Sequence, residues 1–556
     1  MRRSLLSLGA ILVIGCGGAD TGIPNADGGE GGPMDGGSDT GVDTAVDVCM
    51  SVPEICGDGV GNDCDGTIDN GCKNLGTYVS GATGVDTNPG TKLSPVKTIA
   101  QGIKNAQAIG GKLSVYVANS HYPEKVTLVE GISLDGGYHC DTTLCDWMRN
   151  PSMWDTAILN PDFQGVLAPA TITRATKIDG FRLQGMPGAP PGFPGTAAIT
   201  VLGSPTISGN RINGGDINGG SPGYMYTSGV SILAPITDPA GPLVENNDIQ
   251  GGAGTATYQS TGILFDWITN PPPMSVSYGL VRNNRIKGGN AAFTYGISDW
   301  SSAGQSALIG NSITGGQGIG SNNGTTSWGM LLFGTVLVDS NLINTDQTTV
   351  GCCNGAQLCG GITSLSSTSI ITNNVVYGAK SMNSAAIHLR DAEKPLGVVI
   401  INGNVLDGAG VGLTGNFTRS AALFLHINNG VNALMGRVRN NVMQGGINLN
   451  RYGVYEDQVP NKTNKPEVLQ FNQFFFPALP NRNDSYWHQW NGTVATDMGT
   501  APAMNQQGDP LLDSTWHLNN GSPCIDKGTP TEAPAKDRDG NNRPMAQGFD
   551  IGADEK

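Results

Sequence analysis

The sequence of 556 residues predicts an all-β solenoid, a single-stranded parallel β-helix. A motif of asparagine, any residue and an apolar residue recurs every 27 to 37 residues along the middle of the chain, which is a period typical of solenoids. A second short apolar run precedes each motif, and glycine-rich corners separate the two. The chain contains 83 glycines, about twice the usual share of roughly 7%, which suits a fold with many tight turns.

The asparagines of this motif are called the ladder asparagines. An asparagine at the same place in every coil predicts a ladder in which side-chain amides bond to the neighbouring turns. We therefore interpret these residues as scaffold and expect function on side chains that point outward. The ladder asparagines are Asn210, Asn247, Asn284, Asn311, Asn341, Asn374, Asn404, Asn441 and Asn472.

Residues 1–16 have the pattern of an export signal. Two arginines precede an apolar run over 5–14, which is too short to span a membrane, and Cys16 follows. The arrangement resembles the bacterial lipoprotein signal, which implies that Cys16 becomes the lipidated first residue of the mature chain. The alternative is an ordinary signal peptide with an incidental cysteine. Residues 17–48, rich in Gly, Asp, Thr and Pro, predict a disordered tether.

Residues 49–73 are rich in Asp, Asn, Gly and Cys. Cys56, Cys64 and Cys72 are spaced eight apart, and Cys49 makes the number even, so disulfides are expected in an exported chain. The segment resembles the Asp/Asn/Cys metal-binding motif of bacterial surface proteins, itself similar to thrombospondin type 3 calcium repeats. Carboxylate and amide oxygens at short intervals suit Ca²⁺, and the alternative is an acidic disulfide-linked linker. The expected Ca²⁺ ligands are Asp58, Asn62, Asp63, Asp65 and Asp69.

Two more cysteine groups lie farther along the chain. Cys140 and Cys145 lie at the two ends of a short loop. Cys352, Cys353 and Cys359 lie in a compact segment without an accompanying histidine. We expect disulfides rather than metal binding at both places.

Packed structure is expected to begin near Tyr78. An Asn-Pro-Gly turn is followed by an amphipathic pattern over Thr98–Ala108, which predicts a helix. The stretch 78–99 resembles the opening of the pectate-lyase-like, right-handed parallel β-helix proteins, in which this helix caps the first coil and shields its open edge. The resemblance implies a right-handed β-helix over 77–480, including the N-terminal cap.

Residues 481–556 are expected to form an irregular C-terminal cap. Three segments, 508–511, 521–528 and 537–555, resemble in that order the choice-of-anchor Q region that follows β-helices on bacterial surface proteins. The resemblance implies a protein of the cell surface. With Cys16 as the lipid anchor, we expect the outer membrane or cell surface of a Gram-negative bacterium. The Asp-Arg-Asp-Gly sequence at 537–540 is interpreted as a turn.

Function is expected on the outward side chains of the second strand of each coil. Aligning these strands on their first apolar residue and alternating inward and outward positions predicts two exposed columns. The first column contains Leu233, Asp266, Trp300, Phe333, Leu365, Arg390 and His426. The second contains Ser231, Leu264, Ser298, Leu331, Thr363, His388 and Phe424.

These columns contain candidates for carbohydrate binding, because sugar rings pack on aromatic faces and hydroxyls take polar partners. The substrate-binding candidates are Asp266, Trp300 and Phe333, with Trp267 one residue beyond the column. The alternative is that the three aromatic residues pack under loops such as the one at 271–273.

Catalysis is a second possibility for the same face. Pectate-lyase-like families pair a Ca²⁺-binding carboxylate cluster with a nearby Lys or Arg as base, but no coil here supplies two or three aspartates together. A glycosidase needs two carboxylates about 5–9.5 Å apart, and the predicted register points Asp299 inward where Asp266 points outward. The catalytic candidates are His388, Arg390, Asp391 and His426.

The net charge of the chain limits the kinds of partner that it is expected to bind. Asp and Glu number 46 against 31 Lys and Arg, for a net charge of −15, and this argues against a nucleic-acid partner, which needs a positive footprint. Two hypotheses follow: a monomeric, lipid-anchored surface protein with a calcium-binding stalk, non-catalytic or carbohydrate-binding, or a polysaccharide lyase or glycoside hydrolase.

Overall fold

The computed structural model describes the chain from Gly76 to the C-terminus, with gaps. It describes 76–109, 113–188, 195–217 and 504–556 without a break. Between 226 and 495 it has gaps at 235–237, 255–257, 268–277, 301–304, 319–324, 346–357, 366–367, 391–397, 411–417, 427–432, 435, 458–463, 477–482 and 489–493.

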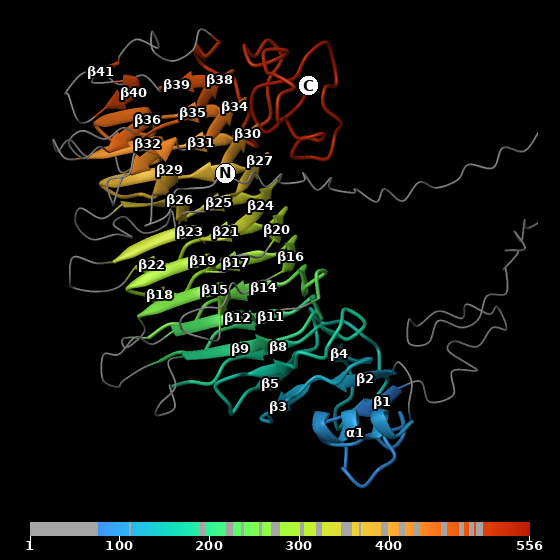
Figure 1. Ribbon diagram of the computed structural model, residues 1–556. Coiled ribbons are helices and arrows are strands. Elements are labelled where there is room, and N and C mark those ends of the chain that lie inside the picture. Colours follow the sequence, from blue (N-terminus) through green and yellow to red (C-terminus); the bar gives the residue numbers. More distant parts are fainter. Residues whose placement is uncertain are drawn as a thin grey trace, which may run out of the picture.

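Three long sheets run side by side through the coils (Figure 1). Sheet I contains, in spatial order, β1 (Gly76–Val79), β2 (Leu113–Ala118), β4 (Ile132–Tyr138), β7 (Lys177–Asp179), β10 (Thr206–Ser208), β13 (Leu243–Glu245), β16 (Gly279–Arg282), β20 (Gln305–Ile309), β24 (Thr335–Asp339), β27 (Ile370–Thr372), β30 (Ile400–Asn402), β34 (Arg437–Arg439) and β38 (Val468–Gln470). Sheet II contains β3 (Ser120–Tyr122), β5 (Thr156–Leu159), β8 (Arg182–Gln184), β11 (Arg211–Asn213), β14 (Asp248–Gln250), β17 (Arg285–Lys287), β21 (Ser312–Thr314), β25 (Leu342–Asn344), β28 (Val375–Tyr377), β31 (Val405–Asp407), β35 (Val442–Gln444), β39 (Gln473–Phe475) and β42 (Gln506–Gln507).

Sheet III completes each coil. It contains β6 (Val166–Ala168), β9 (Gly195–Val201), β12 (Tyr226–Ala234), β15 (Gln259–Trp267), β19 (Phe293–Asp299), β23 (Thr326–Leu332), β26 (Leu358–Leu365), β29 (Asn383–Arg390), β32 (Arg419–His426), β36 (Asn450–Asp457), β40 (Asn483–His488) and β41 (Val494–Ala495). Two small pairs, β18 (Asn290–Ala291) with β22 (Gln317–Gly318) and β33 (Ala433–Leu434) with β37 (Asn464–Lys465), lie beside it. All strand pairs in the three sheets are parallel except the pair of β40 and β41.

The chain therefore forms the predicted right-handed parallel β-helix, with strands from sheets I, II and III following one another in each coil. The predicted capping helix is present as α1 (Ile99–Ile109), which buries Ile99, Ile103 and Ala106 against the first coil. It lies at the end of the stack opposite the last coils (Figure 1). No helix among the described residues is long and apolar enough to cross a membrane.

The ladder asparagines form the ladder that the sequence predicts. Asn247 is representative: its Nδ2 donates to the Oδ1 of Asn284 at 3.0 Å and to the carbonyl oxygens of Ile207 and Glu245 at 2.9 Å. Its backbone N–H also donates to the Oδ1 of Asn284, at 2.9 Å. The residue before each ladder asparagine has a positive φ, for example 56° at Asn246, which forms the tight corner between sheets I and II.

A second set of recurring hydrogen bonds lies at the corner between sheets II and III. A hydroxyl group at the start of the sheet III strand donates to a glycine carbonyl of this corner, as Ser260 Oγ does to Gly252 at 2.6 Å and Ser327 Oγ to Gly316 at 2.7 Å. The corners lie so close together that a Cβ on Gly289 would be 1.7 Å from the Gly252 oxygen. At position 289, glycine is therefore the only residue that fits without displacement.

The β-helix continues one coil farther than the motif predicts. Asn472 donates from its Nδ2 to the Oδ1 of Asn505 at 3.0 Å, and β42 pairs with β39. Asn505 has no apolar residue two positions later, because Gln507 stands there. The motif missed this coil because it requires an apolar residue two positions after the asparagine. At the end of the stack, the residue at that position no longer needs to fill a closed core.

The C-terminal residues 504–556 fold back along the outer face of sheet II beside the last coils (Figure 1). Asn440, at a corner, donates to the Thr529 carbonyl and accepts from the Thr529 N–H, both at 2.8 Å. A fully buried ion pair between Arg543 and Glu555, 2.8 Å long, fixes the region internally. The Asp537 carboxylate accepts two backbone N–H groups, so the sequence at 537–540 forms the predicted turn.

Cysteine pairing agrees with the prediction where the structure describes it. Cys140 and Cys145 form a disulfide, and Cys359 is also disulfide-bonded. Cys352 and Cys353 lie outside the described residues. Residues 1–75, with Cys16 and the expected Ca²⁺ ligands Asp58, Asn62, Asp63, Asp65 and Asp69, likewise lie outside them.

Candidate functional site on the outer face of sheet III

The outward columns on sheet III have the register that the sequence predicts, but the second column, from Ser231 to Phe424, is buried rather than exposed as predicted. Thr363, His388 and Phe424 pair in succession across β26, β29 and β32. In the other column Arg390 lies between Leu365 and His426. Because neighbouring parallel strands lie about 4.8 Å apart, this register brings the candidate side chains of both columns together.

His388, Arg390 and His426 form one group. The rings of His388 and His426 are 5.7 Å apart between centroids. His388 Nδ1 lies 3.0 Å from the Thr363 hydroxyl, while His388 Nε2 and Arg390 Nε are buried atoms without a hydrogen-bond partner. Buried polar atoms without partners carry a free-energy cost of about 1–3 kcal/mol each, so two of them side by side indicate a place for a ligand.

The electrostatics of this group favour an anion. Burial, with the nearby His426 and Arg390, holds the pKa of His388 well below its ordinary value. His388 is therefore neutral near pH 7, and the fixed positive charge comes from Arg390. Among the ion pairs that the structure describes, none includes Arg390, so its charge is not balanced by a described carboxylate.

Aromatic rings continue from this group along the same face. Trp328 stacks on His388 with centroids 5.5 Å apart, and the Phe424 ring lies 4.8 Å from that of Tyr455. The guanidinium of Arg419 lies 4.9 Å from the Tyr455 ring centroid and donates to its hydroxyl at 2.7 Å. These residues form a buried cluster on the outside of sheet III, separate from the core inside the coils.

Sequence reasoning missed Trp328 because the alternation slips at a glycine. Met330 belongs to the inner core while Trp328 and Leu331 belong to the outer cluster, so two outward positions are three residues apart. Gly329 lies between them facing inward, where a Cβ would be 2.5 Å from Ile343. A glycine just before the first apolar residue of these strands was the signal that could have revealed the slip.

The predicted binding residues have mixed outcomes. Trp300 and Phe333 are half-buried and lie 6.2 Å apart between centroids, two to three coils from Arg390. Asp299 is buried inside the coil, as predicted, between Phe265 and Leu332. The side chains of Asp266 and Trp267, and the whole of Asp391, lie outside the described part of the chain. The described residues therefore show no paired carboxylates on this face.

A further titratable group lies in the C-terminal region. His517, Asp539 and Asp554 have ligand atoms within 4.8 Å of one another. His517 Nε2 lies 2.6 Å from an Asp539 oxygen, and Asp554 accepts the Leu518 N–H at 2.8 Å. These contacts join three segments of the C-terminal region. They give the three side chains a structural role there.

Comparison with known proteins finds solved structures that are similar to this chain. No protein-family model matches the chain, and no curated protein matches it in sequence. The catalytic unit of a thermostable GH87 alpha-1,3-glucanase from Streptomyces thermodiastaticus strain HF3-3 is similar at 13% identity and TM-score 0.44, over 74% of this chain and 64% of that chain. The tailspike protein gp49 of Acinetobacter baumannii bacteriophage Fri1, a capsular polysaccharide depolymerase, is similar at 10% identity and TM-score 0.36, over the same shares.

XylC, solved in complex with xylose, is similar at 11% identity and TM-score 0.35, over 86% of this chain and 98% of that chain. This chain spans less than two thirds of the glucanase and tailspike chains. The activities in these names belong to those proteins, and the fold of this chain follows from its own strand register.

Proposed function

We propose that this protein is a surface carbohydrate-binding protein whose outer face of sheet III binds an acidic polysaccharide. The observation that carries the proposal is the pair of buried, unpartnered nitrogens, His388 Nε2 and Arg390 Nε, beside a buried cluster of aromatic rings. A guanidinium suits the carboxylate of an acidic sugar. Aromatic faces suit the apolar faces of pyranose rings, and half-buried Trp300 and Phe333 extend the face to further units of a chain.

Replacing Arg390 by glutamine is expected to lower the affinity for polygalacturonate at least tenfold, because the change removes the positive charge and keeps much of the side-chain volume. Affinity is measured by isothermal titration with the exported protein. A neutral glucan should bind weakly to both proteins.

Arg285→Gln is the matched control for this experiment. Arg285 is exposed on sheet II, where it pairs with Asp248, so its loss should leave the affinity within about twofold. Equal losses in both variants, or full affinity in Arg390→Gln, would count against the proposed face.

A polysaccharide lyase is the second candidate, favoured by His388. With the proton on Nδ1 donated to the Thr363 hydroxyl, His388 Nε2 presents a lone pair. In a β-elimination this nitrogen takes the proton next to the uronate carboxylate, a carbon–carbon double bond forms, and the glycosidic oxygen leaves with its electron pair and is then protonated. Ultraviolet absorbance of an unsaturated product, abolished in His388→Gln, would establish this candidate; binding without such product would exclude it.

The proposal includes lipid anchoring through Cys16, on the pattern of the first 16 residues. Cys16→Ser is expected to move the protein from the membrane fraction to the soluble fraction of the producing cells. Mass spectrometry of the wild-type N-terminus should find a lipidated cysteine. Cys49→Ser is the control, because it changes a cysteine outside the signal.

The proposal also includes a Ca²⁺-binding stalk at residues 49–73. Removal of Ca²⁺ with a chelator is expected to raise the rate of proteolysis within this segment at least fivefold, because carboxylates that share an ion repel one another without it. Asp63→Asn together with Asp65→Asn should be cleaved rapidly with or without Ca²⁺. Cleavage at the same rate before and after chelation would contradict the metal assignment.

A further inference from the structure

The outer face of sheet II changes character along the stack. The residue that follows the ladder asparagine is polar in the early coils, apolar from Leu342 to Val442 and polar again in the last ladder coil. In coil order these residues are Arg211, Asp248, Arg285, Ser312, Leu342, Val375, Val405, Val442 and Gln473. The C-terminal region covers Val375, Val405 and Val442 completely, but Leu342 remains 40% exposed. One apolar position beyond the covered ones is thus left open.

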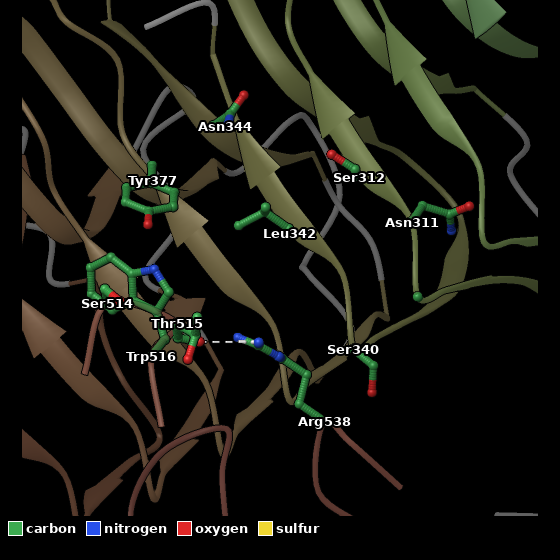
Figure 2. Close-up of a pocket in the computed structure, with 11 residues that line it drawn as sticks. Asn311, Ser312, Ser340, Leu342, Asn344, Tyr377, Ser514, Thr515, Trp516 and Arg538 are labelled. Atoms are coloured by element: carbon green, nitrogen blue, oxygen red, sulfur yellow. Dashed lines mark hydrogen bonds between the residues drawn. The ribbon is translucent and has the colours of Figure 1, made fainter. Parts of the chain in front are cut away.

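A pocket of about 700 Å³ lies at this border, between sheet II and the C-terminal region. Figure 2 shows Tyr377 and Trp516 together on one side of it, Leu342 toward the middle and Ser312 opposite. The volume falls within the roughly 300–1,000 Å³ of small-molecule sites. The pocket lies on sheet II and is separate from the face of sheet III described above.

The lining includes apolar surfaces that suit the apolar face of a ring. Trp516 packs its edge against Tyr377, with centroids 5.2 Å apart and planes at 80°. Burial and the nearby Asp407 raise the pKa of Tyr377 to about 12, so its hydroxyl keeps its proton near neutral pH. Leu342 adds an exposed aliphatic surface next to these two residues.

Polar groups of the pocket suit hydroxyls and one negative charge. Arg538 donates from Nη2 to the Thr515 carbonyl at 3.1 Å (Figure 2), and none of the described ion pairs includes it. Ser312 and Ser340 add hydroxyl groups to the lining. The lining of the pocket thus combines hydroxyl groups and a guanidinium without a carboxylate.

We infer that this pocket is a second saccharide site, which takes one acidic sugar unit. The sugar ring packs on Trp516 and Leu342, its carboxylate lies at Arg538, and one of its hydroxyls bonds to the Ser312 hydroxyl. The C-terminal region is thereby a part of a binding site as well as a cover for the late coils. This inference goes beyond the proposed function and does not depend on the sheet III face.

The test uses the exported protein labelled with 5-fluorotryptophan, followed by ¹⁹F NMR. The chain has eight tryptophans, and the Trp516 resonance is assigned with W516F. Added galacturonate is expected to shift this resonance saturably. Arg538→Gln should weaken the apparent affinity at least tenfold and Leu342→Asn at least threefold, and both residues are accessible enough for the variants to fold. Galactose, the neutral counterpart, should bind at least tenfold more weakly.

Arg390→Gln distinguishes the two sites. It should abolish tight binding of the polysaccharide and leave the Trp516 shift with galacturonate within twofold, so that each site can fail alone. A Trp516 resonance that does not move with galacturonate would overturn the second site. An affinity unchanged in Arg538→Gln, or equal affinity for galactose, would overturn its assignment to acidic sugars.

Discussion

Replacing Asn341 by alanine is expected to lower the free energy of unfolding by about 3–5 kcal/mol. Asn341 is completely buried. Its Oδ1 accepts from the N–H and the Nδ2 of Asn311, and its Nδ2 donates to Asn374 and to the carbonyl oxygens of Leu308 and Asp339. Alanine makes none of these bonds, and the groups left behind are out of reach of water.

The ladder position makes this loss larger than that of one ordinary hydrogen bond. Stacked coils interact only with their neighbours, so the change at Asn341 weakens the interfaces on both of its sides. Urea unfolding followed by circular dichroism measures the effect as a lower midpoint. Asn520→Ala, at an exposed asparagine of the C-terminal region, should change the stability by less than about 0.5 kcal/mol. A similar small change at Asn341 would contradict the role of the ladder.

Gly289→Ala is expected to destabilise the protein by about 3 kcal/mol or more, because a well-packed backbone cannot move away from a new methyl group at low cost. The new Cβ would lie 1.7 Å from the Gly252 oxygen and 2.2 Å from Ser260 Oγ. Relief requires separation of two coils at the corner, which also breaks the bond from the Gly289 N–H to Ser260 Oγ.

Gly540→Ala separates this steric effect from backbone conformation. Gly540 has φ +89° with nothing within 4 Å of its would-be Cβ, so alanine there costs only the unfavourable backbone conformation, about 1 kcal/mol. Thermal unfolding of both variants gives the comparison. A Gly289→Ala protein as stable as Gly540→Ala would show that the corners separate easily.

Much of the candidate site was predictable because it depends on local alternation. Once Ile387 and Leu423 are assigned inward, His388 and Phe424 must point outward, and stacking of equivalent positions places His426 beside Arg390. Trp328 was missed since one glycine shifts the alternation within its strand. A single inward glycine looks the same in the sequence as a corner glycine.

The sequence by itself determined the coil. Asparagine, an apolar residue and glycine recur in the same order from coil to coil. This order specifies which atoms stack, because each coil repeats the same bonds with its neighbour. Only the tertiary structure decided where the C-terminal region lies. Its contacts with the coils, such as that of Asn373 with Lys536, join residues 163 positions apart. Outward valines such as Val375 mark a covered face, but no local pattern reports which segment covers it, so the Leu342 pocket that it leaves open follows from packing alone.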